Sequence, residues 1–221
     1  MREHGNVLAL HEPFCNIADY GETRVSGSTV RAPEELIAML LMLGQTRAVF
    51  FKDTTDRPHP AVLASPPFLT GATHTFLIRR PAEIAASYYA IRPGMTIDEI
   101  GLATLYELYQ AVLAQSGHPP VVIDSADLVA NPAGIMAAYC DAAGIPFSEQ
   151  ALTWHPGQRA EWSPSARWHT AVERTSTFTQ LAASYPETVA NNAKLAEFSA
   201  YHEPYYQELR ASRLVPSRWR A

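Results

Sequence analysis

The chain has 221 residues, of which 47% are hydrophobic, and a net charge of −5. This length suits one folded domain with a full core, and the negative charge argues against general nucleic-acid binding, which needs an excess of lysine and arginine. No apolar run approaches the ~18 residues of a membrane span and no secretory signal is recognisable, so we expect a single domain over residues 1–221, cytoplasmic and without a membrane partner.

Four short apolar runs, each followed by a polar segment or a helix, predict buried parallel strands. They cover residues 6–10, 47–52, 75–78 and 120–123. Between the first two runs, Pro33, two following acids and a closing Gly44 predict a helix over residues 33–44. The alternation of strands and helices predicts a three-layer α/β domain with a mostly parallel central sheet and helices on both faces.

The second half of the chain carries further helix signals. A capping box formed by Thr96 and Glu99, an Asn131-Pro132 cap closed by Gly144, and a later proline predict three more helices. They are expected from Thr96 to about residue 115, from Pro132 through residue 143, and from Pro186 onward. The aromatic residues 152–180 are expected to form a coiled or partly helical flap over the sheet edge. Cys15 and Cys140 lack metal-ligand spacing, so we expect reduced thiols and no metal site.

An apolar strand that runs straight into arginines and a helix start has the outline of an anion site. Arg79 ends the third predicted strand, and Pro81 begins a helix whose first amides and positive dipole end are unpaired. Arg79 and Ser87, eight residues later, could together hold a phosphate. The alternative is a surface ion pair for Arg79 and a solvent-facing Ser87, which is the default for either residue alone.

Three segments then point to one family. Residues 74–89, with Arg79, Ser87 and two tyrosines, resemble the 3′-phosphate motif of sulfotransferases that use 3′-phosphoadenosine-5′-phosphosulfate. Residues 121–147 resemble the strand, Asp-Leu, helix and Gly-Ile-Pro-Phe of the same family, and residues 11–14 resemble the His-Glu-Pro-Phe signature of its bacterial and plant-like branch. The resemblance implies sulfuryl transfer from that donor to a hydroxyl of a small-molecule acceptor, without a metal or a covalent enzyme intermediate.

The resemblance implies further roles at the same sheet edge. Lys52, which ends the second predicted strand, would contact the sulfuryl group or the bridging oxygen. Glu12 or His59 would accept the proton of the hydroxyl, although Glu12 could instead cap local amides and His59 could be a surface loop residue. Arg174 and Ser176 would close over the adenosine or its 3′-phosphate.

One family segment has no counterpart in this sequence. Sulfotransferases open with a strand and a Pro-Arg-Ser-Gly loop that cradles the 5′-phosphosulfate. Residues 26–29 imitate the loop without a preceding apolar strand, so we expect a polar loop there. Either the chain begins too late, or the loop is lost. The alternative function is therefore a non-catalytic protein of the same fold that binds a nucleotide or a partner, and the oligomeric state stays open.

Overall fold

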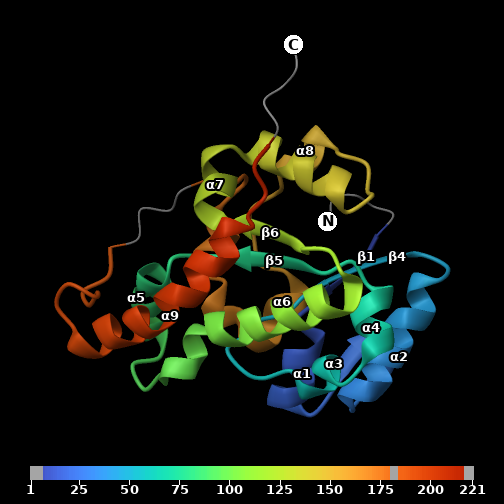
Figure 1. Ribbon diagram of the computed structural model, residues 1–221, viewed down its shortest axis with the longest axis horizontal. Coiled ribbons are helices and arrows are strands. Elements are labelled where there is room, and N and C mark those ends of the chain that lie inside the picture. Colours follow the sequence, from blue (N-terminus) through green and yellow to red (C-terminus); the bar gives the residue numbers. More distant parts are fainter. Residues whose placement is uncertain (1–6, 180–183, 217–221) are drawn as a thin grey trace.

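The computed structural model describes residues 7–179 and 184–216 (Figure 1). All four predicted strands are present, each within one residue of its expected ends: β1 (Val7–His11), β4 (Ala48–Lys52), β5 (Thr75–Ile78) and β6 (Val121–Asp124). β1 pairs in parallel with β4, and β5 in parallel with β6. The predicted α/β class is confirmed, and these strands form two separate parallel pairs.

Helices surround the strand pairs. In Figure 1, α7 and α8 lie on one side of β5 and β6, and α6 and α9 lie on the other. Most helices begin at a proline, whose fixed φ and missing N–H suit the first helical position. The helices are α1 (Pro13–Tyr20), α2 (Pro33–Gly44), α3 (Pro60–Leu63), α4 (Pro66–Gly71), α5 (Pro81–Ile91), α6 (Leu102–Ser116), α7 (Ser125–Ala130), α8 (Pro132–Ala142) and α9 (Ala193–Ala211).

Three segments differ from the sequence expectation. The capping box of Thr96 is present, but Gly101 adopts φ 80° and splits the expected helix into a 3-10 turn, η2 (Ile97–Ile100), and α6. α9 begins at Ala193 rather than Pro186, because the Asn192 side chain caps it. The expected polar loop at residues 26–29 lies largely in a hairpin, β2 (Thr23–Val25) and β3 (Ser28–Val30), in which Ser26 and Gly27 both have positive φ.

The aromatic segment is irregular, as expected. Its short 3-10 turns are η3 (Glu149–Leu152), η4 (Ala160–Trp168) and η5 (Val172–Arg174). Both cysteines are buried free thiols. Within residues 7–179 and 184–216, no helix is both long and apolar enough to cross a membrane.

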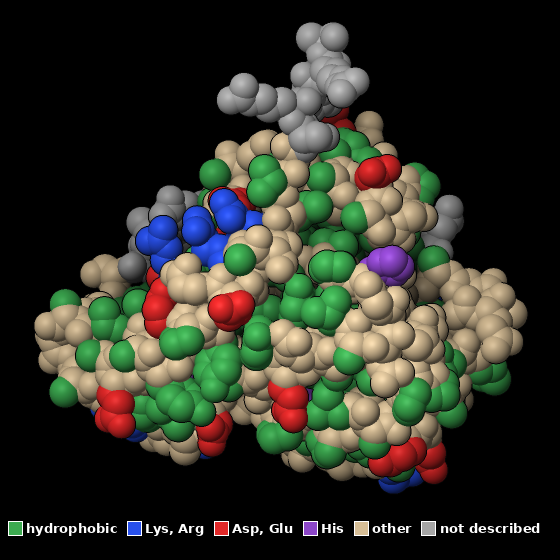
Figure 2. Space-filling model, in the orientation of Figure 1, with side chains coloured by type: hydrophobic (Ala, Val, Ile, Leu, Met, Phe, Trp, Pro, Cys, Tyr) green, Lys and Arg blue, Asp and Glu red, His purple; other side chains and the backbone are tan. Residues whose placement is uncertain are grey.

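Arginine side chains, drawn in blue, gather on the face shown in Figure 2, near the carboxyl-terminal part of α9. Arg210 there pairs with the buried Asp124 at the end of β6, and Arg213 pairs with Asp127 of α7. These pairs attach α9 to β6 and α7, so this cluster has a structural explanation.

A cavity of about 1810 Å³ lies between β4 and β5. Every residue of β4 lines it, and so do Thr75, Phe76 and Leu77 of β5. Side chains alternate between the two faces of a strand, so a cavity lined by consecutive residues lies along the strand edges. The opposite edges of β4 and β5 are paired with β1 and β6. Within residues 7–179 and 184–216 no strand pairs with the remaining edges of β4 and β5, and these two free edges border the same cavity.

β4 and β5 also run in the same direction along this cavity. Gly71, which ends α4 before β5, lies against the Leu41 side chain of α2, which precedes β4. At the other end, the Tyr88 hydroxyl of α5 donates a hydrogen bond of 3.3 Å to Asp56, which follows β4. The carboxyl ends of both strands therefore open on one side of the molecule.

Candidate functional site

Glu12 and Lys52 meet where β1 and β4 end. The register pairs His11 with Lys52, and the Glu12 amide donates a 2.7 Å hydrogen bond to the Lys52 carbonyl. Glu12 has φ 47° and ψ 49°, a left-handed conformation that costs free energy for any residue with a Cβ. Its carboxylate forms an ion pair with the Lys52 ammonium. The Glu12 side chain is 13% exposed and that of Lys52 is 49% exposed, so the ammonium remains accessible to a ligand.

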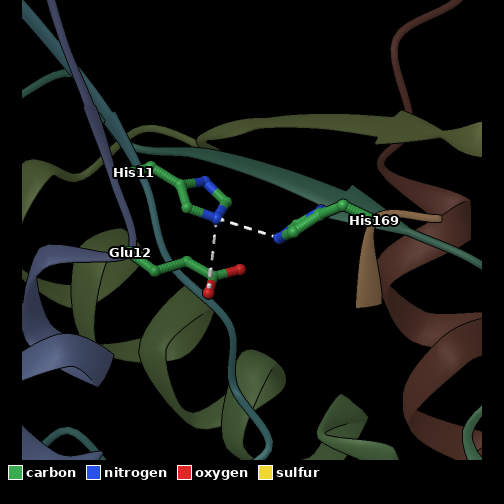
Figure 3. A group of neighbouring side chains, drawn as sticks. All are labelled: His11, Glu12 and His169. Atoms are coloured by element: carbon green, nitrogen blue, oxygen red, sulfur yellow. Dashed lines mark hydrogen bonds and ion pairs between the residues drawn. The ribbon is translucent and has the colours of Figure 1, made fainter. Parts of the chain in front are cut away.

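His169 completes this corner from the aromatic segment (Figure 3). The Nε2 atoms of His11 and His169 lie 3.2 Å apart, and His11 Nε2 lies 3.6 Å from Glu12 Oε2. Ser165 Oγ lies 3.1 Å from His169 Nε2, and the Trp162 ring stacks on the His169 ring with centroids 4.8 Å apart. No short pattern in the sequence predicts a role for His169, because only the fold brings it beside His11.

Burial is the largest influence on both imidazoles. It lowers the pKa of His11 and of His169, and the nearby Lys52 ammonium lowers both further, while the Glu12 carboxylate raises them. Both rings are therefore neutral at pH 7. Between two neutral rings only one Nε2 can donate, so the other offers a lone pair.

Asp53 holds the backbone at the start of α1, next to Glu12. Its carboxylate accepts hydrogen bonds from the amides of Phe14 at 2.8 Å and Cys15 at 3.0 Å, at the start of α1. A carboxylate suits the positive end of a helix dipole. Burial raises the pKa of Asp53, and burial, with the Asp53 charge as the second cause, raises that of the Cys15 thiol to about 12. α1 is thereby bound to the end of β4, with Glu12 between them.

Arg79 and Ser87 converge, as their spacing predicted. Arg79 Nη1 lies 3.4 Å from Ser87 Oγ, and its Nε donates a 2.9 Å hydrogen bond to Glu83. Ser87 Oγ also donates to the Ile84 carbonyl at 3.1 Å. The Arg79 side chain is 42% exposed, so an anion can reach it. The neighbouring Arg80 instead interacts with Tyr206 of α9.

Tyr88 connects this pair to the rest of the site. The single proton of its hydroxyl is shared between the carboxylates of Asp56 at 3.3 Å and Glu99 at 3.1 Å, and its ring packs against Trp168 of η4 with centroids 4.7 Å apart. Burial and the two carboxylates raise its pKa. Tyr88, Lys52 and Glu12 all line the cavity between β4 and β5. The cavity therefore extends from the Glu12–Lys52 corner to Tyr88, the residue that follows Ser87.

The other predicted residues lie in less revealing places. His59 is 7% exposed, its Nε2 lies 2.7 Å from the Thr54 carbonyl, and its ring meets Phe14 edge-on. It is not a surface loop residue, and this packing favours a structural role, so its function in proton transfer stays a prediction. Arg174 and Ser176 are exposed, and within the described residues no side-chain hydrogen bond or ion pair joins either to Arg79 or Ser87. Their closure over a nucleotide also stays a prediction.

One comparison with known proteins identifies a family for this chain. A family model described as "Sulfotransferase domain" matches residues 25–212. Two curated Arabidopsis thaliana proteins, "Branched-chain-amino-acid aminotransferase-like protein 2" and "Branched-chain-amino-acid aminotransferase-like protein 1", are 33% and 34% identical over 118 residues. The match covers 52% of this chain and 20% of each relative, so this chain spans about a fifth of their length.

A solved structure, "Sulfotransferase Domain from the Curacin Biosynthetic Pathway", aligns with a TM-score of 0.41 at 13% identity, covering 77% of this chain and 67% of that one. The family model extends from Val25, the last residue of β2, to Ser212, the residue after α9. This chain belongs to the sulfotransferase domain family.

Proposed function

We propose that this domain transfers a sulfuryl group from 3′-phosphoadenosine-5′-phosphosulfate to a hydroxyl of a small-molecule acceptor. The observation that carries the proposal is the approach of Arg79 and Ser87 to 3.4 Å where β5 leads into α5. An exposed guanidinium, a hydroxyl and the positive end of a helix dipole are together suited to a phosphate. Membership of the sulfotransferase domain family makes the 3′-phosphate of this donor the preferred candidate.

Lys52 offers an accessible positive charge where the sulfuryl group would be transferred to the acceptor. During transfer, the acceptor oxygen bonds to sulfur as the bond from sulfur to the bridging oxygen breaks, and negative charge develops on that oxygen. The Lys52 ammonium would stabilise this charge, as cationic groups do in the related in-line transfer of phosphoryl groups. The leaving product is adenosine-3′,5′-bisphosphate.

The proton of the hydroxyl needs an acceptor in the same corner. Glu12 was predicted for this role, but its carboxylate already forms an ion pair with Lys52. In the neutral His11–His169 pair one Nε2 lone pair accepts the hydrogen bond between the rings and becomes available when that bond opens, and His11 Nε2 lies 3.6 Å from that carboxylate. We propose that this pair takes the proton and that Glu12 stabilises the resulting imidazolium.

The free edges of β4 and β5 determine how the 5′ side of the donor would be held. An extended segment in the cavity between them would pair with both edges, and a loop after it would emerge beside Lys52, which lies at the carboxyl end of β4. Transfer as proposed requires such a segment. Without it, the same free edges favour the second candidate, a non-catalytic protein that binds a nucleotide through Arg79 and Ser87.

Both candidate functions require that Arg79 binds the 3′-phosphate. Calorimetric titration with adenosine-3′,5′-bisphosphate and with adenosine-5′-phosphate tests this requirement. Arg79→Ala should weaken binding of the bisphosphate by the ~1.5–3 kcal/mol of a charged hydrogen bond, and leave binding of the monophosphate unchanged. Arg31→Ala, which removes an exposed arginine paired with Glu22, is the matched control. Equal weakening for both nucleotides would show that Arg79 does not read the 3′-phosphate. Transfer of labelled sulfate to an acceptor separates the enzyme from the binding protein.

A further inference from the structure

Three metal-ligating side chains converge at the corner between β1 and η4 (Figure 3). One ligand atom each from His11, Glu12 and His169 lies within 4.8 Å of the other two. Among the residues that the structure describes, this is the one group of three or more His, Cys, Asp or Glu side chains with such spacing. From this geometry we propose that His11, Glu12 and His169 form a binding site for Zn²⁺.

The separations suit a single zinc ion. With Zn–N distances of ~2.0–2.1 Å and tetrahedral angles, two nitrogen ligands lie ~3.4 Å apart. The two Nε2 atoms are 3.2 Å apart, and His11 Nε2 is 3.6 Å from Glu12 Oε2. A small rotation of the Glu12 side chain would bring all three ligand atoms within reach of one ion.

The chemistry of the three ligands selects the kind of metal. Two imidazoles and one carboxylate suit zinc, whereas magnesium and calcium prefer sites built from oxygen ligands. Both imidazoles present the same atom, Nε2, and these two atoms lie 3.2 Å apart. Ser165 Oγ, 3.1 Å from His169 Nε2, adds a neighbouring oxygen.

Lys52 opposes a cation at this place. Its ammonium pairs with Oε1 of Glu12, while Oε2 faces His11. Removing this positive charge should therefore tighten zinc binding, which a non-specific surface site would not do. Zinc at this site would also occupy the imidazole lone pairs that take the proton of the substrate hydroxyl, and would thereby inhibit sulfuryl transfer. This inhibition rests on the proposed function, whereas zinc binding itself does not.

The test is calorimetric titration of ZnCl₂ into chelator-treated protein at pH 7.5, without nucleotide or acceptor. We expect one zinc ion per chain with a dissociation constant in the micromolar range or below, and no comparable binding of MgCl₂. His169→Ala should weaken zinc binding at least tenfold, His155→Ala should leave it unchanged, and Lys52→Met should tighten it several-fold. His155 is an exposed histidine of the same aromatic segment.

Circular dichroism verifies that each variant is folded. If His169→Ala does not fold, Lys52→Met still tests the site, because unchanged or weaker zinc affinity in that variant contradicts it. Millimolar binding by the unmodified protein, or equal affinity in the unmodified and His169→Ala proteins, would overturn the proposal. Neither result would affect sulfuryl transfer, which is measured separately.

Discussion

Glu12 and Lys52 are joined twice, once through the backbone hydrogen bond between neighbouring strand ends and once through their charged side chains. The chain turns at Glu12 into α1, so one residue follows a strand, precedes a helix and places a carboxylate beside the ammonium. This double connection leads to two separate predictions, one for activity and one for stability.

Lys52→Met should lower kcat for sulfuryl transfer by about 10²–10³-fold, the usual effect of removing one group that stabilises charge in a transition state. Binding of adenosine-3′,5′-bisphosphate should weaken as well, because the bridging oxygen stays on its 5′-phosphate and loses the Lys52 charge. Steady-state kinetics and calorimetry measure the two effects. Lys194→Met, in α9, removes a lysine away from the corner and should retain full activity. Unchanged kcat in Lys52→Met would remove Lys52 from the mechanism.

Replacing Glu12 separates its backbone strain from its charge. Glu12→Gly and Glu12→Ala both remove the carboxylate, but only glycine adopts φ 47° without cost. Glu12→Gly should therefore be more stable than Glu12→Ala by about 1 kcal/mol. This difference already allows for the greater conformational entropy that glycine gives the unfolded chain. Urea denaturation measures the difference. Equal stabilities would mean that the left-handed conformation is not strained in solution.

Gly101→Ala should destabilise the protein by about 1–3 kcal/mol. The residue has φ 80°, and an added Cβ would lie 2.8 Å from the Thr55 carbonyl oxygen. Gly94→Ala is the matched control, since Gly94 lacks a positive φ and has open space around its Cβ position. Thermal unfolding of the two variants should separate them clearly, and similar melting temperatures would contradict the close approach between Gly101 and Thr55.

Stability should decrease as pH falls below 6.5, in part because of His202. This residue is 0% exposed, its Nε2 lies 2.8 Å from the Ile97 carbonyl, and burial lowers its pKa from 6.5. As pH falls through 6.5 the unfolded chain takes up the proton first, so protons favour unfolding until the folded-state pKa is reached. The slope contributed by one such histidine is at most about 1.4 kcal/mol per pH unit.

His202→Gln removes the titrating group while keeping a donor near Ile97, so the free energy of unfolding should depend less on pH between 6.5 and 5.5. The exposed His155, replaced by glutamine, is the control and should leave the slope unchanged. Urea denaturation at several pH values provides the comparison. An unaltered slope in His202→Gln would mean that the folded protein protonates His202 as readily as the unfolded chain does.

Sequence patterns predicted the elements that depend on a few consecutive residues. Apolar runs located β1, β4, β5 and β6 within about one residue, and proline, Asn131 and the Thr96 capping box located helix starts. The approach of Arg79 to Ser87 was also predictable, because both lie on one strand-to-helix unit. The predicted start of the last helix at Pro186 was wrong, because α9 begins after the Asn192 cap.

What the sequence determined by itself was therefore local: the α/β class, the family resemblance and the pair of residues suited to an anion. Only the tertiary structure placed His169 beside His11 across 158 positions, buried His59, and set the free edges of β4 and β5 along one cavity. Helix and strand signals repeat within a few residues, whereas contacts between distant segments depend on how whole elements pack, and no short pattern in the chain encodes that packing.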